Sequence, residues 1–152
     1  HEGIRGMKTA GLSAAGLCLA AGTLALAHQG VTNPVILERM GSMTRMQESA
    51  EILGEMAKGE RPFDAAAARA AARAIAREAD RTPDLFAPRR TDPNSEALPA
   101  IWEAFDTFEA HASDLATAAR SADGEIDTRA DLGPALAGIG GACRACHEDF
   151  RE

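Results

Sequence analysis

Apolar residues recur every three or four positions in four separate stretches of the chain, which is the pattern of helices that bury one face. The first helix is predicted for residues 34–58, between an Asn33 N-cap and a terminating Gly59. Its expected inner stripe is Ile36, Arg39 or Met40, Met43, Met46, Ala50, Leu53 and Ala57. The second helix is predicted to begin after Asp64 and to extend, mostly as alanine, to about residue 80.

Two further helices are expected after an irregular, proline-containing link at residues 81–98. The third begins near Pro99, and its expected stripe is Ile101, Phe105, Phe108, Ala112, Leu115 and Ala119. A turn at residues 121–125 leads to the fourth helix, whose expected stripe is Leu132, Leu136, Ile139, Cys143, Cys146 with His147, and Phe150. If Asp131 caps this helix, Pro134 falls in its first turn; an earlier start predicts a kink.

The composition agrees with an all-α protein. A length of 152 residues is enough for one ordinary domain, and 45% of the residues are apolar, so a core can form. Only 4% of the residues are aromatic and none is tyrosine, whereas alanine is abundant. Small side chains of high helix propensity suit closely packed helices and suit a sheet poorly.

The N-terminal segment has the features of an export signal. Lys8 supplies a positive charge, residues 9–27 are almost free of charge, and Ala25 and Ala27 form the small-x-small ending of a cleavage site. We therefore assign residues 1–27 to a leader and residues 28–152 to the four-helix domain. Residues 1–6 precede the apparent start at Met7 and receive no role.

Two other interpretations of the leader are less favoured. The apolar run is about long enough to span a bilayer, but its cleavage-like end favours removal. Cys18 follows Leu17 and not a small residue, which argues against a lipid anchor on that cysteine. Removal of the leader takes away Arg5, Lys8 and Glu2 and shifts the net charge from −7 to −8. Such an acidic chain is expected to avoid nucleic acid and anionic membranes and to favour basic partners.

The motif Cys143-Arg144-Ala145-Cys146-His147 predicts covalent attachment of one haem c. Two cysteines three positions apart lie on one helix face, where each thiol can add to one of two neighbouring haem vinyl groups. The adjacent His147 then supplies an axial nitrogen to the iron. A thioredoxin-like motif would normally follow a strand, and a zinc site would need two more ligands nearby, so both are less favoured.

The chain resembles the cytochrome c prime family. The resemblance lies in Gly59-Glu60-Arg61-Pro62-Phe63-Asp64-Ala65-Ala66, Leu98-Pro99-Ala100-Ile101-Trp102 and the attachment segment from Gly140 to His147, close to the C-terminus. It covers about residues 31–151 and implies an antiparallel, up-down-up-down four-helix bundle. The departures are Gly133-Pro134 in the last helix and the lack of any tyrosine near the haem.

The resemblance also implies roles for residues of the first helix. Arg39 matches an arginine that lies near the haem propionates, and Met43 lies one turn later, where the family usually has an apolar residue that crowds the open side of the haem. Some members have methionine there and are low-spin. We therefore predict that Met43 is the sixth iron ligand, with Met40 or an absent ligand as alternatives. His111 and His28 are not expected to be ligands.

The function predicted from these residues is electron transfer in the periplasm by a six-coordinate, low-spin His/Met haem. The alternative is a five-coordinate, high-spin haem that binds NO or CO. A haem enzyme is not expected, since no His-Arg pair on a distal helix suggests peroxide activation. The family often forms antiparallel dimers through the first two helices, whose small residues include Ala50, Ala57 and Ala68, so a homodimer is favoured over a monomer.

Overall fold

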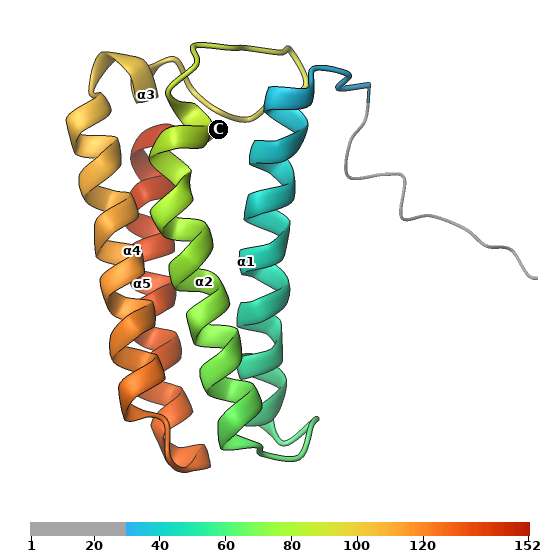
Figure 1. The fold of residues 1–152 in the computed structure, drawn as a ribbon, viewed down its shortest axis with the longest axis vertical. Helices are drawn as coiled ribbons and strands as arrows, with labels where there is room; N and C mark the ends of the chain where they lie inside the picture. The colour runs from blue at the N-terminus through green and yellow to red at the C-terminus, as the bar shows by residue number, and fades with distance from the viewer. Residues whose placement is uncertain (1–29) are drawn as a thin grey trace, which may run out of the picture.

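Four long helices dominate the computed structural model, which describes residues 30–152 (Figure 1). The predicted leader, Cys18 and His28 lie outside the described residues. The elements are α1 (Pro34–Lys58), α2 (Ala65–Phe86), α3 (Ala100–Glu103), α4 (Phe105–Glu125), the 3₁₀ turn η2 (Arg129–Asp131) and α5 (Leu132–Phe150). Within this part of the chain no β-strand forms, and one isolated bridge joins Ala97 to Arg151.

The long helices α1, α2, α4 and α5 alternate in direction, so the predicted antiparallel four-helix bundle is confirmed (Figure 1). Helix α2 packs against α1 and α4, and α4 packs against α5, while α1 and α5 form the loosest of the four neighbouring pairs. Residues 87–99, here called the roof, leave the end of α2 and cross the end of the bundle where the C-terminus also lies. Among the described helices, none is both long and apolar enough to cross a bilayer.

The N-terminal ends of the first two helices form as predicted, because side chains satisfy backbone N–H groups that have no partner within the helix. Asn33 Oδ1 accepts from the Val35 N–H at 3.0 Å, and Asp64 Oδ1 accepts from the Ala67 N–H at 3.0 Å. Gly59 ends α1 with a φ of +80°, the left-handed conformation that a C-cap glycine adopts readily.

Helix α2 continues to Phe86 and not to residue 80 as predicted. Pro83 lies inside the helix, where it removes one N–H and so one backbone hydrogen bond. The buried Thr82 and Phe86 continue the inner face formed by Ile75 and Ala79, so core packing offsets that loss. The predicted link at residues 81–98 is therefore shortened to the roof.

The third and fourth helices also differ from the prediction at their ends. Helix α3 is a single turn, and Ala104, with φ −132° and ψ +51°, separates it from α4. Helix α4 includes the predicted turn at residues 121–125, because burial of Ala122 extends its inner face. Asp131 holds the N-cap position of α5, and Pro134 lies in the first turn, as one of the two alternatives expected.

The inner face of α1 is rotated by about one residue from the predicted stripe. Ser42, Ser49 and Met56 are buried, whereas Met43, Ala50 and Ala57 are only half-buried. Serines were not expected in the core, but both hydroxyls have partners: Ser42 donates to Glu78 at 2.8 Å, and Ser49 donates to the Arg45 carbonyl at 2.9 Å. Satisfied hydroxyls are small enough to let α1 approach α2 closely.

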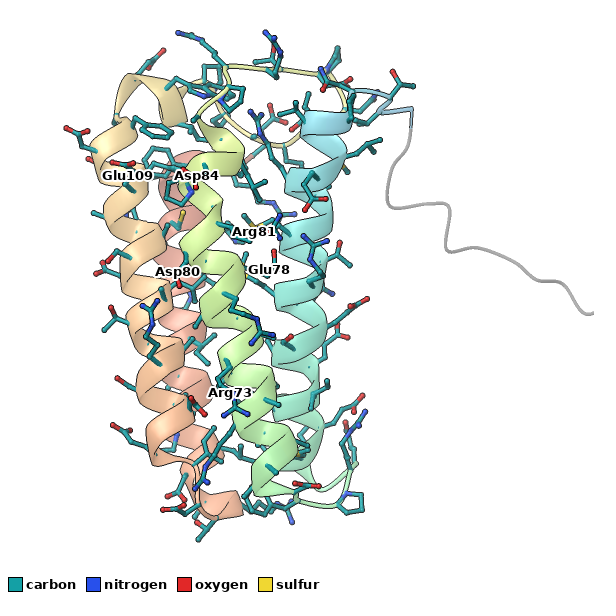
Figure 2. All side chains as sticks on the ribbon, in the orientation of Figure 1. Arg73, Glu78, Asp80, Arg81, Asp84 and Glu109 are labelled. Atoms are coloured by element: carbon teal, nitrogen blue, oxygen red, sulfur yellow. The ribbon has the colours of Figure 1, made fainter. Side chains whose placement is uncertain are left out.

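Helix α2 carries charged residues along both edges of its exposed side (Figure 2). Glu78 and Arg81 lie toward α1, where Glu78 pairs with Arg45. Arg73 and Asp80 lie toward α4 and pair with Asp123 and Arg120. These pairs link neighbouring helices, although exposed pairs of this kind contribute little stability.

Candidate functional site

A cavity of about 790 Å³ lies inside the bundle near the roof. Its wall on α5 includes Cys143, Cys146 and His147, so the structure places the whole predicted attachment motif at one cavity. The remaining walls come from α1, α2, α3, α4 and the roof, and they are mainly apolar. A second group of buried side chains closes the roof end of the cavity: Phe86, Ile101, Phe108 and Phe150.

Three methionines of α1 face this cavity: Met40, Met43 and Met46. Met46 is buried, and the other two are half-buried. Met43 packs against both hydrophobic clusters of the bundle, the large central one that Cys143 also contacts and the one near the roof that Cys146 also contacts. Met43 therefore lines the same cavity as the attachment motif.

The two cysteine thiols are half-buried and are not joined to one another. Burial raises the pKa of the Cys143 thiol. Burial, together with the nearby Cys143 and Asp149, raises the pKa of Cys146 to about 11. Cysteines of disulfide oxidoreductases have lowered pKa values, so these thiols are unsuited to that chemistry. Residues 30–152 also contain no cluster of three or more His, Cys, Asp or Glu residues that could hold a metal ion.

His147 lies at the rim of the cavity and is exposed to solvent there. Its pKa is lowered, first by desolvation and then by the neighbouring Arg151, although Glu96 acts in the opposite direction. A lowered pKa favours the neutral imidazole, which is the form that binds metals through a ring nitrogen.

Arg39 lies in the cavity wall and is only 3% exposed. Its guanidinium donates to the backbone carbonyls of Leu85 and Arg90, both at 2.9 Å, and to that of Pro88. Burial, and then the charge of Arg90, lowers the pKa of Arg39. Arginine has five N–H donors, so two remain for another acceptor. The predicted propionate contact stays a prediction, while the carbonyl contacts are a role that the sequence pattern did not reveal.

His111 also lines the cavity, from α4. Its Nε2 lies 3.1 Å from Asp149 Oδ2, and its ring packs edge-on against Phe150 with 5.9 Å between centroids. Both contacts join α4 to the end of α5. His111 thus has structural partners, and the prediction that it is not an iron ligand is untested.

A comparison with protein families shows what kind of protein contains this cavity. The family model described as Cytochrome C' matches residues 34–151, which is the whole bundle. The chain belongs to the cytochrome c' family. The predicted family is therefore confirmed on nearly the full described length.

Individual cytochromes support the same assignment. The chain is 37% identical to cytochrome c-556 of Agrobacterium fabrum over 88% of each chain. It is 37% identical to a cytochrome c' of Rhodopseudomonas palustris, over 77% of this chain and 81% of that protein. The solved structure of cytochrome c' from Rhodopseudomonas palustris superposes with a TM-score of 0.73 at 36% identity, covering 80% of this chain and 98% of that one.

The cytochrome c' family carries haem c with iron, attached covalently through cysteines near the C-terminus, and the residues of this cavity fit that group. The donor set consists of two protonated thiols at the required spacing, one neutral imidazole beside them and one buried cation. The surrounding walls are apolar enough to receive a large ring. The predicted haem c cofactor is confirmed.

The predicted low-spin, His/Met-ligated electron carrier is wrong. Proteins of the cytochrome c' family usually bind iron through histidine alone and are high-spin, and the matches to that family fit the five-coordinate alternative better. The prediction took a methionine of an apolar stripe for an iron ligand. Met43 faces the cavity beside Met40 and Met46 as part of an apolar wall, and position alone does not make a thioether an iron ligand.

Proposed function

We propose that this chain is a five-coordinate, high-spin haem protein that binds NO or CO. The observation that carries the proposal is the arrangement of the cavity, which combines the attachment motif on α5 with an apolar methionine wall on α1. When bound, the haem would supply an iron atom able to take up a diatomic gas. Among residues 30–152, His147 and His111 are the imidazoles that line this cavity, and His111 Nε2 lies 3.1 Å from Asp149 Oδ2.

In this proposal Cys143 and Cys146 hold the ring by thioether bonds. Their raised pKa values keep them as thiols, the protonated form that adds across a vinyl group. His147 presents a neutral ring nitrogen at the cavity rim. Their places on one face of α5 fix the edge of the ring against that helix.

Arg39 is proposed to neutralise a haem propionate. It is a buried cation, and within residues 30–152 no carboxylate pairs with it. Its three carbonyl partners satisfy donors but supply no negative charge. A carboxylate that enters the cavity could accept from the two remaining N–H groups and offset the cost of burying the charge.

Met43 is proposed to crowd the open side of the haem without binding the iron. Met43 is half-buried between the two hydrophobic clusters, so neighbouring side chains support it on both sides. An unbranched thioether side chain fills irregular space and yields at modest cost. Such a wall admits a small gas and disfavours larger ligands.

The cellular setting is proposed from the leader and the charge. Removal of residues 1–27 in the periplasm would leave a haem-bearing chain of net charge −8, which favours basic protein partners and disfavours nucleic acid and anionic membranes. We class the protein as a binding protein and not as an enzyme. A homodimer through α1 and α2 is also proposed, but Ala68 is fully buried inside the bundle and cannot contribute to that interface.

Optical spectra of the oxidised and reduced protein, each recorded with and without CO, test the proposed function. We expect high-spin spectra in both oxidation states and a new CO-bound spectrum in the reduced state. A haem-stained denaturing gel should show the haem still on the chain, and Cys143→Ala with Cys146→Ala should abolish that stain. A low-spin reduced protein that does not bind CO would overturn the proposal.

A further inference from the structure

The roof forms the non-helical part of the cavity wall. Its residues 94–97 line the cavity, and apart from Arg151 every other lining residue belongs to a helix. Few hydrogen bonds form inside the roof. Ser95 N–H donates to the Asp92 carbonyl at 2.9 Å, Asn94 N–H donates to Asp92 Oδ1 at 2.8 Å, and Ala97 N–H donates to Ser95 Oγ at 3.4 Å. A segment with so few internal bonds opens at lower free-energy cost than a helix does.

Arg39 holds the beginning of the roof. Its Nε donates to Leu85 O at 2.9 Å, its Nη1 donates to Arg90 O at 2.9 Å, and its Nη2 donates to Pro88 O. These acceptors lie in the last turn of α2 and in the first residues of the roof, where carbonyls lack helical partners. One planar guanidinium therefore fixes a turn of six residues to α1.

The same guanidinium brings the two ends of the roof together. Its carbon lies 4.6 Å from the ring centroid of Phe86, just before the roof, and 5.5 Å from that of Trp102, just after it. Trp102 Nε1–H donates to the Phe86 carbonyl at 2.8 Å. Cation–π contacts are strongest when the cation is desolvated, as it is here.

The other end of the roof is joined to the C-terminus. Leu98 N–H donates to the Phe150 carbonyl and Glu152 N–H donates to the Glu96 carbonyl, both at 3.0 Å, and Arg151 pairs with Glu96. These contacts begin only three residues after His147. The roof is thus held between the first helix and the end of the attachment helix, over the cavity.

We infer that Arg39 is a positioning residue for ligand entry: its contacts hold the roof closed, and small ligands reach the cavity when the roof moves. This inference rests on the proposed gas-binding function. Holding the roof differs from neutralising a haem propionate, because it depends on the three N–H groups of the planar guanidinium of Arg39 and not on its charge alone. Entry between α1 and α5, past the exposed Gln47, is the competing route.

Arg39→Lys separates these roles, because lysine keeps the charge and loses the planar fork. In the haem-bound protein we expect hydrogen exchange of residues 88–97 to become roughly tenfold faster, as for the loss of one or two hydrogen bonds. CO association, followed after flash photolysis, should become several-fold faster while the spin state is unchanged. Trp102→Phe keeps an aromatic ring and loses the indole N–H. It should also accelerate both hydrogen exchange of the roof and CO association, but by less than Arg39→Lys does.

Gln47→Phe provides the matched control, since it narrows the gap between α1 and α5 without touching the roof. We expect unchanged roof exchange and an unchanged CO association rate. The inference is overturned if Arg39→Lys and Trp102→Phe leave the rates of roof hydrogen exchange and of CO association unaltered. It is also overturned if Gln47→Phe slows CO association while Arg39→Lys and Trp102→Phe leave that rate unchanged. The spectra of the unmodified protein come first: absence of CO binding rejects the proposed function, whereas CO binding with unaltered variant rates rejects only the role of Arg39.

Discussion

Ser42 on α1 donates its hydroxyl to Glu78 Oε2 on α2 at 2.8 Å. Ser42 has no exposed surface, and the side chain of Glu78 is only 14% exposed. Arg45 donates to both oxygens of the same carboxylate at 3.1 Å, and Arg81 contacts it as well. One carboxylate thus joins the first two helices, at the part of α1 where Arg39 and Met43 line the cavity.

Ser42→Ala is expected to lower the free energy of unfolding by about 1 kcal/mol, because it removes one hydrogen bond to a charged and largely buried acceptor. Ser49→Ala is the matched control on the same buried face of α1. Its hydroxyl bonds only to the Arg45 carbonyl of its own helix, so its loss should change stability little. Urea unfolding followed by circular dichroism measures the free energy of unfolding of both variants. Equal losses of unfolding free energy in the two variants would contradict a special role for the Ser42–Glu78 contact.

The same carboxylate should make stability depend on pH. Burial acts to raise the pKa of Glu78, but hydrogen bonds from Arg45 and Ser42 hold it below its ordinary value of 4.5. A lowered pKa in the folded state means that the ionised form stabilises the fold above pH 4.5, and that this contribution is lost as the pH falls through the lowered pKa. We expect the unfolding free energy of the wild type to exceed that of Glu78→Gln at pH 7 and the difference to shrink below pH 4.5. A difference that grows on acidification would refute this assignment.

Two glycines of the first helix region should respond in opposite directions to alanine. Gly59 has a φ of +80°, and a Cβ there would lie 2.6 Å from a nitrogen of Arg129, so Gly59→Ala should cost about 1–2 kcal/mol of unfolding free energy. Gly54 lies inside α1 with open space around it, so Gly54→Ala should stabilise by about 0.5–1 kcal/mol. Thermal unfolding of both variants checks the pair, and a stabilising Gly59→Ala would show that the turn can rearrange.

The number of long helices, their caps and their order were predictable, because each depends on residues that are close together in the sequence. Asn33, Asp64 and Gly59 act on their own helix ends, and a pattern of that range is visible in one chain. The rotation of α1 was not predictable in this way. Ser42 becomes a core residue only because Glu78, 36 positions later, receives its hydroxyl. Apolar periodicity counts serine as polar and therefore assigned the inner stripe to its neighbours.

In the candidate site, too, the features set by residues close in sequence were predictable, and those set by distant residues were not. Cys143, Cys146 and His147 form one local motif, and their side chains line one cavity as expected. Arg39 was singled out only through the family resemblance, and its contacts with Leu85, Pro88 and Arg90 depend on a turn about fifty residues away. The coordination of the iron is a still finer property. A methionine that packs in a wall and a methionine that binds iron can share one position in the sequence, so the choice needed the comparison with relatives.

Met43→Ala tests the corrected role of this residue most directly. If Met43 only crowds the open side of the haem, the variant and the wild type should both be high-spin, and the variant should bind CO more tightly. Relief of crowding worth about 1 kcal/mol corresponds to roughly fivefold in affinity. Glu48→Ala, at an exposed position of α1 that does not line the cavity, should leave the affinity unchanged. Titration of the reduced proteins with CO measures all three. A low-spin wild type that becomes high-spin on loss of Met43 would instead restore methionine as an iron ligand, because only a bonded sulfur changes the spin state when it is removed.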